Sequence, residues 1–220
     1  MLNRDSLPRI IPFAIYMAFI FLADMLGRAG WPAAELRWLY AVKIAAVLAA
    51  LLAYRRRYSE LAWRRIGIAT LAAAAACGLL VLVLWLNLSQ GWMRLGSSVG
   101  FDPHSGGSIS WPLAAVRLAG GALVVPVMEE LFWRSFLMRW VDVPDFLQTD
   151  PARVGVRGFV VTVILFGFEH NLWLAGMAAG AVYSMLYMRC RSLWPAIVAH
   201  GVTNGALGAW IIATASWTYW

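Results

Sequence analysis

The sequence has little charge for its length. Charged residues make up 13% of its 220 residues, and hydrophobic residues make up 62%. A soluble domain is about 25% charged and roughly half apolar. This composition excludes an ordinary soluble globular domain. It predicts an all-α, polytopic bundle of transmembrane helices that forms one compact unit.

Cysteine is also scarce, and several common motifs are missing. The two cysteines, Cys77 and Cys190, both lie in apolar segments, so neither a disulfide framework nor a zinc ribbon is supported. The sequence lacks H-E-x-x-H, the usual helical signature of a zinc protease. No internal repeat and no low-complexity segment is found.

The formal net charge of +7 comes mostly from arginine in short loops. The most basic loop contains Arg55, Arg56, Arg57, Arg64 and Arg65. By the positive-inside rule this loop and the N-terminus are expected on the cytoplasmic side of the membrane. The basic residues are not interleaved with a soluble fold, so nucleic-acid binding is not expected. No A-x-A-like cleavage site clearly ends the first apolar run, which we interpret as an anchor that is kept.

Apolar stretches alternate with polar loops, which predicts about six to eight membrane helices around a polar cavity. The expected spans are 10–26, 36–54, 66–86, 112–140, 158–174 and 193–215, with a short Gly/Ala-rich segment at 176–188. We expect an N-terminal part, 1–111, and a catalytic part, 112–220. The Gly-, Ser- and Trp-rich segment 87–111 is longer than an ordinary connection and predicts an extracytoplasmic lid or a re-entrant piece. His104 within it is expected to be a solvated loop histidine.

The stretch 126–139, PVMEELFWRSFLMR, places two adjacent carboxylates inside an apolar run. Such groups are costly in a membrane and therefore indicate a functional site. Glu130 precedes Arg134 by one helical turn, the favourable order for an ion pair, whereas Glu129 is turned roughly 100° away. We expect the pair to be structural and Glu129 to be available for chemistry. Pro126 is expected to kink the helix beside Glu129.

Two later helices carry polar groups at a spacing of four residues. Phe166 and His170 form one such pair, and His200 and Asn204 form the other. Counting 1.5 Å per residue from the predicted cytoplasmic ends places Glu129, His170 and His200 within roughly 8 Å of one depth. The groups are therefore expected to meet. Phe166 is expected to pack in the core or form a pocket wall.

This constellation supports two chemistries. In the first, Glu129 takes a proton from a water held with the help of His170, while His200 and Asn204 donate hydrogen bonds to the oxyanion. In the second, both histidines and a glutamate coordinate a metal that activates the water. Interhelical hydrogen bonding without catalysis and a proton relay in a transporter are further alternatives. Glu169 either pairs with an arginine or lines the same cavity.

The motifs resemble those of the type II CAAX prenyl endopeptidases. These belong to the broader CPBP group of intramembrane proteases and bacteriocin-processing or self-immunity proteins. The resemblance covers about 112–208. Its motifs are E-E-x-x-x-R (Glu129, Glu130, Arg134), F-x-x-x-H (Phe166, His170) and H-x-x-x-N (His200, Asn204), in this order on separate membrane helices.

The resemblance implies a glutamate-dependent endopeptidase that acts on a membrane-embedded protein or peptide and requires no metal or other cofactor. It implies that Glu129 is the base, that His170 is its partner on the water, and that His200 and Asn204 form the oxyanion site. Glu130 and Arg134 would then have supporting roles. A non-enzymatic scaffold or immunity-type protein is the alternative.

The stretch 124–140 and the short chain also resemble the bacterial branch associated with exosortase and PEP-CTERM sorting systems, which implies a multi-pass protein of a bacterial inner membrane with a cytoplasmic N-terminus. Because bacteria generally lack prenylated CAAX proteins, the resemblance supports peptide-bond hydrolysis better than a prenyl-peptide substrate.

Overall fold

The computed structural model describes residues 4–62, 66–96 and 100–220. Over these ranges it is a helical bundle, and the predicted all-α membrane fold is confirmed. The α-helices are α1 (Leu7–Arg28), α2 (Ala33–Ala53), α3 (Ile68–Asn87), α4 (Trp111–Ala119), α5 (Val125–Glu130), α6 (Met138–Trp140), α7 (Val156–Phe168), α8 (Trp173–Cys190) and α9 (Trp194–Thr214). Two π-helical turns, η4 (Gly120–Val124) and η5 (Leu131–Leu137), join α4, α5 and α6.

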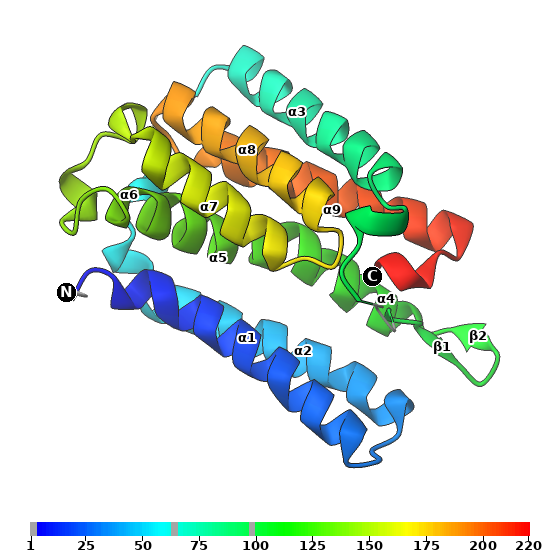
Figure 1. Cartoon of the computed structure of the whole chain (residues 1–220). Helices are drawn as coiled ribbons and strands as arrows, with labels where there is room; N and C mark the ends of the chain where they lie inside the picture. Colours follow the sequence, from blue (N-terminus) through cyan, green and yellow to red (C-terminus); the bar gives the residue numbers. More distant parts are fainter. Residues whose placement is uncertain (1–3, 63–65, 97–99) are drawn as a thin grey trace.

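In the part of the chain that the structure describes, five helices are long and apolar enough to cross a membrane. They are α1, α2, α3, the continuous helix Trp111–Trp140 and α9, with α7 and α8 packed among them. Successive helices run in alternate directions (Figure 1). The N-terminus and α6 therefore lie at one end of the bundle, and the C-terminus lies at the other.

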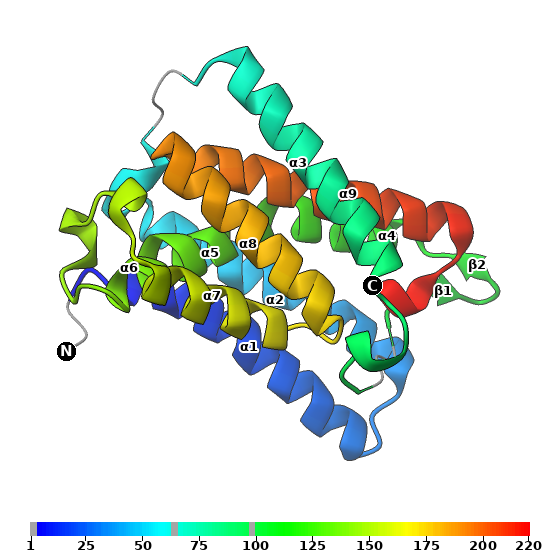
Figure 2. The ribbon, with the colours of Figure 1, turned by 45° about the horizontal axis from the view of Figure 1, so that its top comes forward.

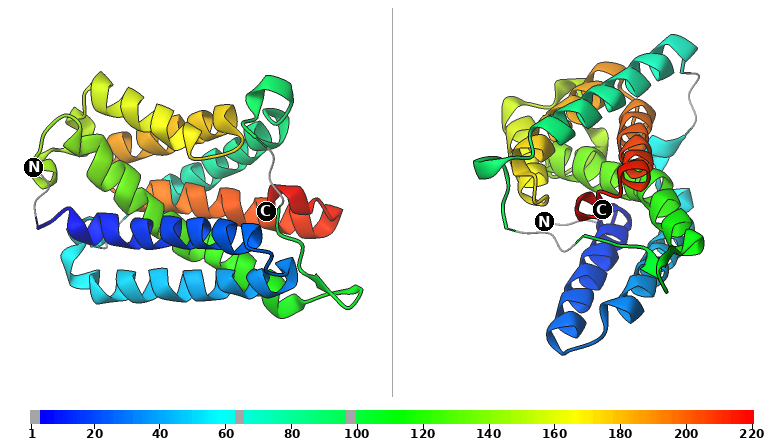
Figure 3. Two further views of the ribbon diagram at one scale, coloured as in Figure 1. Left: turned by 60° about the horizontal axis from the view of Figure 1, so that its bottom comes forward. Right: turned by 90° about the vertical axis from the view of Figure 1, so that its right-hand side faces the viewer.

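The helix 111–140 lies between two groups of helices (Figure 3). The α1–α2 hairpin packs on one side of it, and α7 and α9 pack on the other. Helix α3 covers α8 and α9 from outside (Figure 2). This central position brings the paired glutamates near side chains from the later helices.

Pro126 interrupts the α-helical hydrogen bonding of the central helix near Glu129, where the sequence predicts a kink. The π-helical turn η4 ends directly before α5, and the Val125 N–H bonds to the Gly120 carbonyl five residues back. Pro126 has no N–H to offer the next carbonyl, that of Gly121. The Asn204 side-chain amide donates to this freed carbonyl instead, with Nδ2 2.9 Å from the oxygen. The proline thus creates the contact that holds Asn204.

The prediction of one helix through 158–174 was wrong. Helix α7 ends at Phe168, and His170 lies in the turn before α8. The His170 N–H bonds to the Gly167 carbonyl rather than to that of Phe166. The His170 ring takes over the missing bond, with Nδ1 2.8 Å from the Phe166 oxygen. The F-x-x-x-H spacing therefore caps the end of a helix.

Helices α3 and α9 approach closely at Gly78. A Cβ atom there would collide with the carbonyl oxygen of Ala199. The Thr203 hydroxyl lies 2.8 Å from the Gly78 carbonyl oxygen, which ties the two helices together. Small residues at such crossings are typical of membrane helix packing.

The segment between α3 and α4 contains a short 3₁₀ turn, η3 (Gly91–Met93), and an antiparallel hairpin of β1 (His104–Ser105) and β2 (Ser108–Ile109). The Leu95 N–H bonds to the Asn171 carbonyl at 2.7 Å, so the segment packs against the turn between α7 and α8. His104 is more than one-third exposed, and its Nδ1 lies 2.6 Å from Asp102 Oδ1. It does not line the cavity described below.

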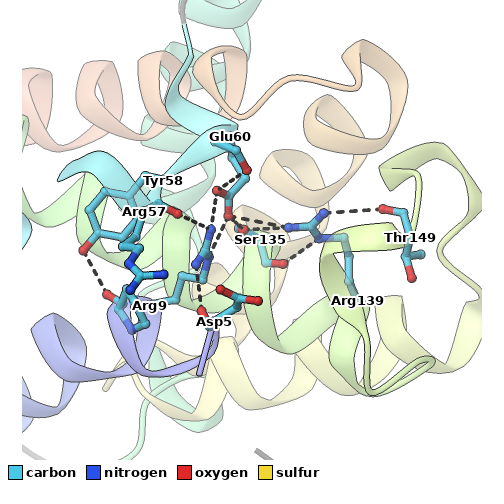
Figure 4. A network of polar contacts seen from close by, with 10 residues as sticks. Asp5, Arg9, Arg57, Tyr58, Glu60, Ser135, Arg139 and Thr149 are labelled. Carbon is cyan, nitrogen blue, oxygen red and sulfur yellow. Dashed lines mark hydrogen bonds and ion pairs between the residues drawn. The ribbon is translucent and has the colours of Figure 1, made fainter. Parts of the chain in front are cut away.

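A buried polar network at the N-terminal end fastens the α1–α2 hairpin to the central helix (Figure 4). Arg9 on α1 makes two bonds to the Glu60 carboxylate, from Nε at 2.8 Å and from Nη2 at 2.5 Å. Glu60 lies in the 3₁₀ turn η2 (Ser59–Leu61) and also accepts a hydrogen bond from Ser135. Arg139 donates to the same Ser135 hydroxyl at 2.8 Å. Arg64 and Arg65, predicted to belong to this basic region, lie outside the described residues.

Burial alone would raise the pKa of Glu60, but the hydrogen bonds and charge of Arg9, together with Ser135, hold it below its usual range. We predict that Glu60→Gln lowers the free energy of unfolding at neutral pH by about 3 kcal/mol, because one partner of a buried pair is lost. A depressed folded-state pKa stabilises the protein above the unfolded-state pKa, about 4.3. This stabilisation is lost as the pH falls through the folded-state value.

The measurement is thermal unfolding of both proteins in detergent between pH 7 and pH 3. The gap in melting temperature between the wild type and Glu60→Gln should be constant near neutrality and should shrink below about pH 4. Glu35→Gln, at an exposed position of α2, is the control and should change little. A gap that widens as the pH falls would contradict the assignment.

Candidate active site

Glu130 joins two helices through one carboxylate oxygen. Its side chain is fully buried. Oε1 accepts from Arg134 Nη1 at 3.0 Å, one turn along the same helix, which confirms the predicted ion pair. The same oxygen lies 2.9 Å from Nδ1 of His200 on α9. Because the ionised carboxylate only accepts, the hydrogen of the neutral His200 ring is on Nδ1.

The Arg134 guanidinium is enclosed by other helices. Its Cζ lies 4.1 Å from the centroid of the Phe166 ring on α7 and 5.4 Å from that of Tyr183 on α8. Both contacts are of the cation–π kind. Phe166 thus packs against the ion pair. The sequence predicts that it packs in the core or forms a pocket wall. The Glu130–Arg134 ion pair therefore contacts side chains of α7, α8 and α9 and stabilises their positions relative to α5.

Glu129 faces the opposite side of the same imidazole. Its Oε2 lies 3.9 Å from His200 Nε2 and is buried without a hydrogen-bond partner among the residues that the structure describes. With the hydrogen on Nδ1, Nε2 presents a lone pair to Glu129. Two acceptors at this separation can share the hydrogens of one water molecule.

The His170 ring also has a nitrogen that can accept a hydrogen bond. Its Nδ1 faces a backbone carbonyl, which only accepts, so the hydrogen of the neutral ring is on Nδ1 and Nε2 is an acceptor. The ring is held by edge contacts with Trp85 of α3, at a centroid distance of 5.2 Å, and by Phe166, at 4.8 Å.

These groups line a single cavity of about 190 Å³. Glu129, Phe166, His170, His200 and Asn204 all contribute to its wall. Glu130 and Arg134 do not line the cavity but contact residues that do, His200 and Phe166. One amide hydrogen of Asn204 is used on the Gly121 carbonyl, so the amide is held beside the cavity with its second hydrogen still to donate.

A second cavity of about 300 Å³ adjoins the first. The two share Trp85, His170, Tyr219 and Trp220. Arg94, from the segment between α3 and α4, lines only the second cavity. The two cavities therefore adjoin where the C-terminal residues Tyr219 and Trp220 pack.

Some polar groups near the site do not belong to it. Glu169, whose role was left open, accepts a hydrogen bond from Trp133 Nε1 at 3.0 Å; it forms no ion pair within the described ranges and does not line the cavity. Over the same ranges no three His, Cys, Asp or Glu side chains are grouped closely enough to hold a metal ion. The ligand set of the metal hypothesis is therefore not brought together.

Tyr183 was missed by sequence reasoning. Its ring stacks on His200 at a centroid distance of 4.9 Å and an interplanar angle of 17°. Its hydroxyl donates to Thr203 at 2.7 Å. Tyr183 lies in a segment predicted only from its small residues, and no spacing in that segment indicated it. Arg117 of α4 also lines the cavity.

Residues 111–206 match the model of the Type II CAAX prenyl endopeptidase Rce1-like family. The Rce1-like region begins at the first residue of α4 and includes every motif residue named above. It covers less than half of the chain, and α1–α3 lie outside it. No curated protein and no solved structure matches the chain. At family level the match supports a peptidase of the intramembrane CAAX type.

We predict that Arg134→Met lowers the free energy of unfolding by about 3–5 kcal/mol, because it leaves a buried carboxylate without its cation. Thermal unfolding in detergent, followed by tryptophan fluorescence, measures the change. The matched control is Arg28→Met. Arg28 forms an ion pair of the same spacing with Asp24, at 2.9 Å, on an exposed surface, and such pairs contribute little. Equal losses in the two variants would contradict a structural role for the buried pair.

Proposed function

We propose that the protein is an intramembrane endopeptidase that uses Glu129 to activate water. The observation that carries the proposal is the placement of Glu129 Oε2 beside the Nε2 lone pair of His200 in a shared cavity. This oxygen is buried and accepts no hydrogen bond from any residue that the structure describes. Buried carboxylates in membrane bundles are costly and mark functional sites. The substrate is a membrane-associated protein or peptide.

The proposed reaction begins with a water that donates its hydrogens to Glu129 and His200. Glu129 takes one proton, and the resulting hydroxide attacks the carbonyl carbon of the scissile bond. His170 Nε2 accepts a further hydrogen bond and helps to place the nucleophile. The proton is then returned to the departing amine nitrogen as the C–N bond breaks.

Asn204 is the proposed donor to the oxyanion. Its amide is fixed by the Gly121 carbonyl, so it does not reorganise as charge develops, and fixed donors contribute most. With its hydrogen on Nδ1, the neutral His200 ring can only accept a hydrogen bond at Nε2. We therefore assign His200 to the water, since Nε2 can donate a hydrogen bond only after it has taken up a proton. In this respect the proposal departs from the family-based expectation that His200 donates to the oxyanion from the start.

The charge distribution supports an orientation. Four segments at the end of the bundle that carries the N-terminus (Figure 1) are basic. They are the 3₁₀ turns η1 (Arg55–Arg57) and η7 (Pro151–Arg153), the start of α7 with Arg157, and the end of α8 with Arg189 and Arg191. By the positive-inside rule this end is cytoplasmic. We therefore propose that the site is reached from the extracytoplasmic face of a bacterial inner membrane. A role alongside exosortase-type sorting stays a prediction.

We predict that Glu129→Gln abolishes cleavage and leaves the fold intact. Glutamine keeps the shape of the side chain but has no carboxylate to take the proton, so the loss should be at least about 100-fold. The measurement compares the peptide termini found in membranes of cells that express the wild type with those of cells that express the variant, at matched protein levels.

Glu35→Gln is the control, because it makes the same substitution at an exposed position of α2 that does not line the cavity. This variant should yield the wild-type termini. If Glu129→Gln produced the same new termini as the wild type, Glu129 would not be the base. If the wild type produced none beyond those of the variant, a scaffold or immunity-type role would replace the peptidase.

A further inference from the structure

A polar cavity of about 430 Å³ lies at the end of the bundle that carries the N-terminus. Its wall is formed by the 3₁₀ turns η2, η6 (Phe146–Gln148) and η7, by the end of the central helix, and by the turn between α8 and α9. Over the described residues it shares no side chain with the cavity that contains Glu129. The polar cavity is therefore separate from the candidate active site.

Both acids in the wall of the polar cavity are already bound to an arginine. Glu60 accepts two hydrogen bonds from Arg9, at 2.8 and 2.5 Å. Asp150 Oδ1 lies 3.5 Å from Arg191 Nε. Arg139 lies 3.6 Å from Glu60 Oε1, an oxygen that Arg9 Nε already occupies. Three arginines thus share two carboxylates, which leaves one positive charge over.

Hydrogen-bond donors in the same wall are also unused. Arg139 gives its Nε and Nη2 hydrogens to Ser135 and Glu60 and one Nη1 hydrogen to the Thr149 carbonyl (Figure 4), which leaves one of its five N–H groups without an acceptor. Tyr187 of α8 is 2% exposed, and its hydroxyl has no hydrogen-bond partner in the described part of the chain. A buried hydroxyl normally has one. The surplus charge and these donors together suit an anion.

An apolar groove of about 830 Å³ adjoins the polar cavity, and Arg191 and Ser192 line both. It lies between the start of α3 and the end of α8, where the first turns of α3 stand apart from α8 (Figure 2). Apolar side chains of this α3–α8 groove are Ile66, Ala69, Ala73, Leu186 and Pro195. A ligand that fills both hollows needs an anionic group and an apolar chain.

We propose that the polar cavity and the α3–α8 groove together bind one phospholipid of the adjacent membrane leaflet. Its phosphodiester contacts Arg139, Tyr187 and Arg191, and an acyl chain lies in the groove. A phosphodiester carries one negative charge, which matches the surplus positive charge. Arginine binds phosphate oxygens through charge-assisted hydrogen bonds. Basic pockets between membrane helices are known to hold lipid headgroups. The inference does not depend on the proposed peptidase function.

The position of the two hollows favours a lipid over a soluble phosphate compound. Arg191 directly follows α8, and Gly67 directly precedes α3, so the hollows meet at the ends of membrane helices. Headgroups lie at this level, just outside the hydrocarbon core. The groove extends inward past Ala73, five residues into α3, or about 8 Å along the helix axis. A soluble phosphate would use the polar cavity alone.

The test compares three probes by isothermal titration calorimetry with the purified full-length protein in a nonionic detergent. Dihexanoyl phosphatidylglycerol has the phosphodiester and the chains, dihexanoylglycerol has only the chains, and glycerophosphoglycerol has only the phosphodiester. The first should bind about tenfold or more tightly than either of the others, because only it uses both hollows. Equal affinity of dihexanoylglycerol would show that the phosphate is not recognised. Equal affinity of glycerophosphoglycerol would indicate a soluble ligand. Either result would overturn the proposal.

Variants of the polar cavity assign the phosphate to its wall. Tyr187→Phe removes one hydroxyl and Arg191→Gln removes one charge, and each should weaken binding of dihexanoyl phosphatidylglycerol about fivefold or more. Tyr54→Phe and Arg153→Gln make the same changes at the same end of the bundle but outside the cavity, and should leave the affinity unchanged. Arg139 is kept, because it also belongs to the buried network in Figure 4. Wild-type affinity in both Tyr187→Phe and Arg191→Gln would overturn the site.

A bulky side chain in the groove tests the position of the acyl chain. Ala73→Phe should weaken binding of dihexanoyl phosphatidylglycerol about fivefold or more and leave that of glycerophosphoglycerol unchanged. Ala72→Phe adds the same ring at an exposed neighbouring position that does not line the groove, and should have no effect. Equal affinities of these two variants would contradict the placement of the chain. Glu129→Gln should bind the lipid as the wild type does, so failure of the peptidase proposal and failure of this one are distinguished.

Discussion

A single buried carboxylate, Glu130, determines how the polar groups of this bundle are placed. It is neutralised by Arg134 on its own helix and bonds to His200 on α9, with no exposed surface. A buried charge of this kind is tolerated only when it is paired and hydrogen-bonded. The pairing sets the His200 tautomer and turns Nε2 toward Glu129. Two adjacent glutamates thus acquire different roles from their surroundings. Glu130 is bound to Arg134 and His200, whereas Glu129 Oε2 has no hydrogen-bond partner in the described part of the chain.

Local sequence patterns were sufficient for part of this description. The apolar composition predicted the helical membrane bundle, and the four-residue spacing of Glu130 and Arg134 predicted their ion pair. Depth counting also succeeded in indicating that residues from three segments line one cavity. These inferences depend on helix geometry and on the cost of charge in lipid, which act within one helix or along one axis. The division of the chain into 1–111 and 112–220 stays a prediction.

Other features depend on contacts between helices and could not be read from spacing. Sequence reasoning placed His170 inside a helix, but the helix ends two residues earlier and the ring caps it. The partner of Asn204 is a backbone carbonyl freed by Pro126, 78 positions earlier in the chain. The network of Arg9, Glu60 and Arg139 joins three distant segments. Lys43 could have been noticed, because an intramembrane lysine is itself a signal, but its contacts with the Tyr16 and Tyr40 rings appear only in three dimensions.

The account depends most directly on which nitrogen of His200 carries the hydrogen. The chain has three histidines, so ¹⁵N-histidine labelling gives a spectrum that single His→Gln variants can assign. In detergent at neutral pH, the His200 signal should show a protonated Nδ1 and a bare Nε2, and Glu130→Gln should perturb it while Asp102→Asn leaves it unchanged. A His200 ring with its hydrogen on Nε2 would contradict the account, because the lone pair would then face Glu130 and no acceptor would be directed at the water beside Glu129.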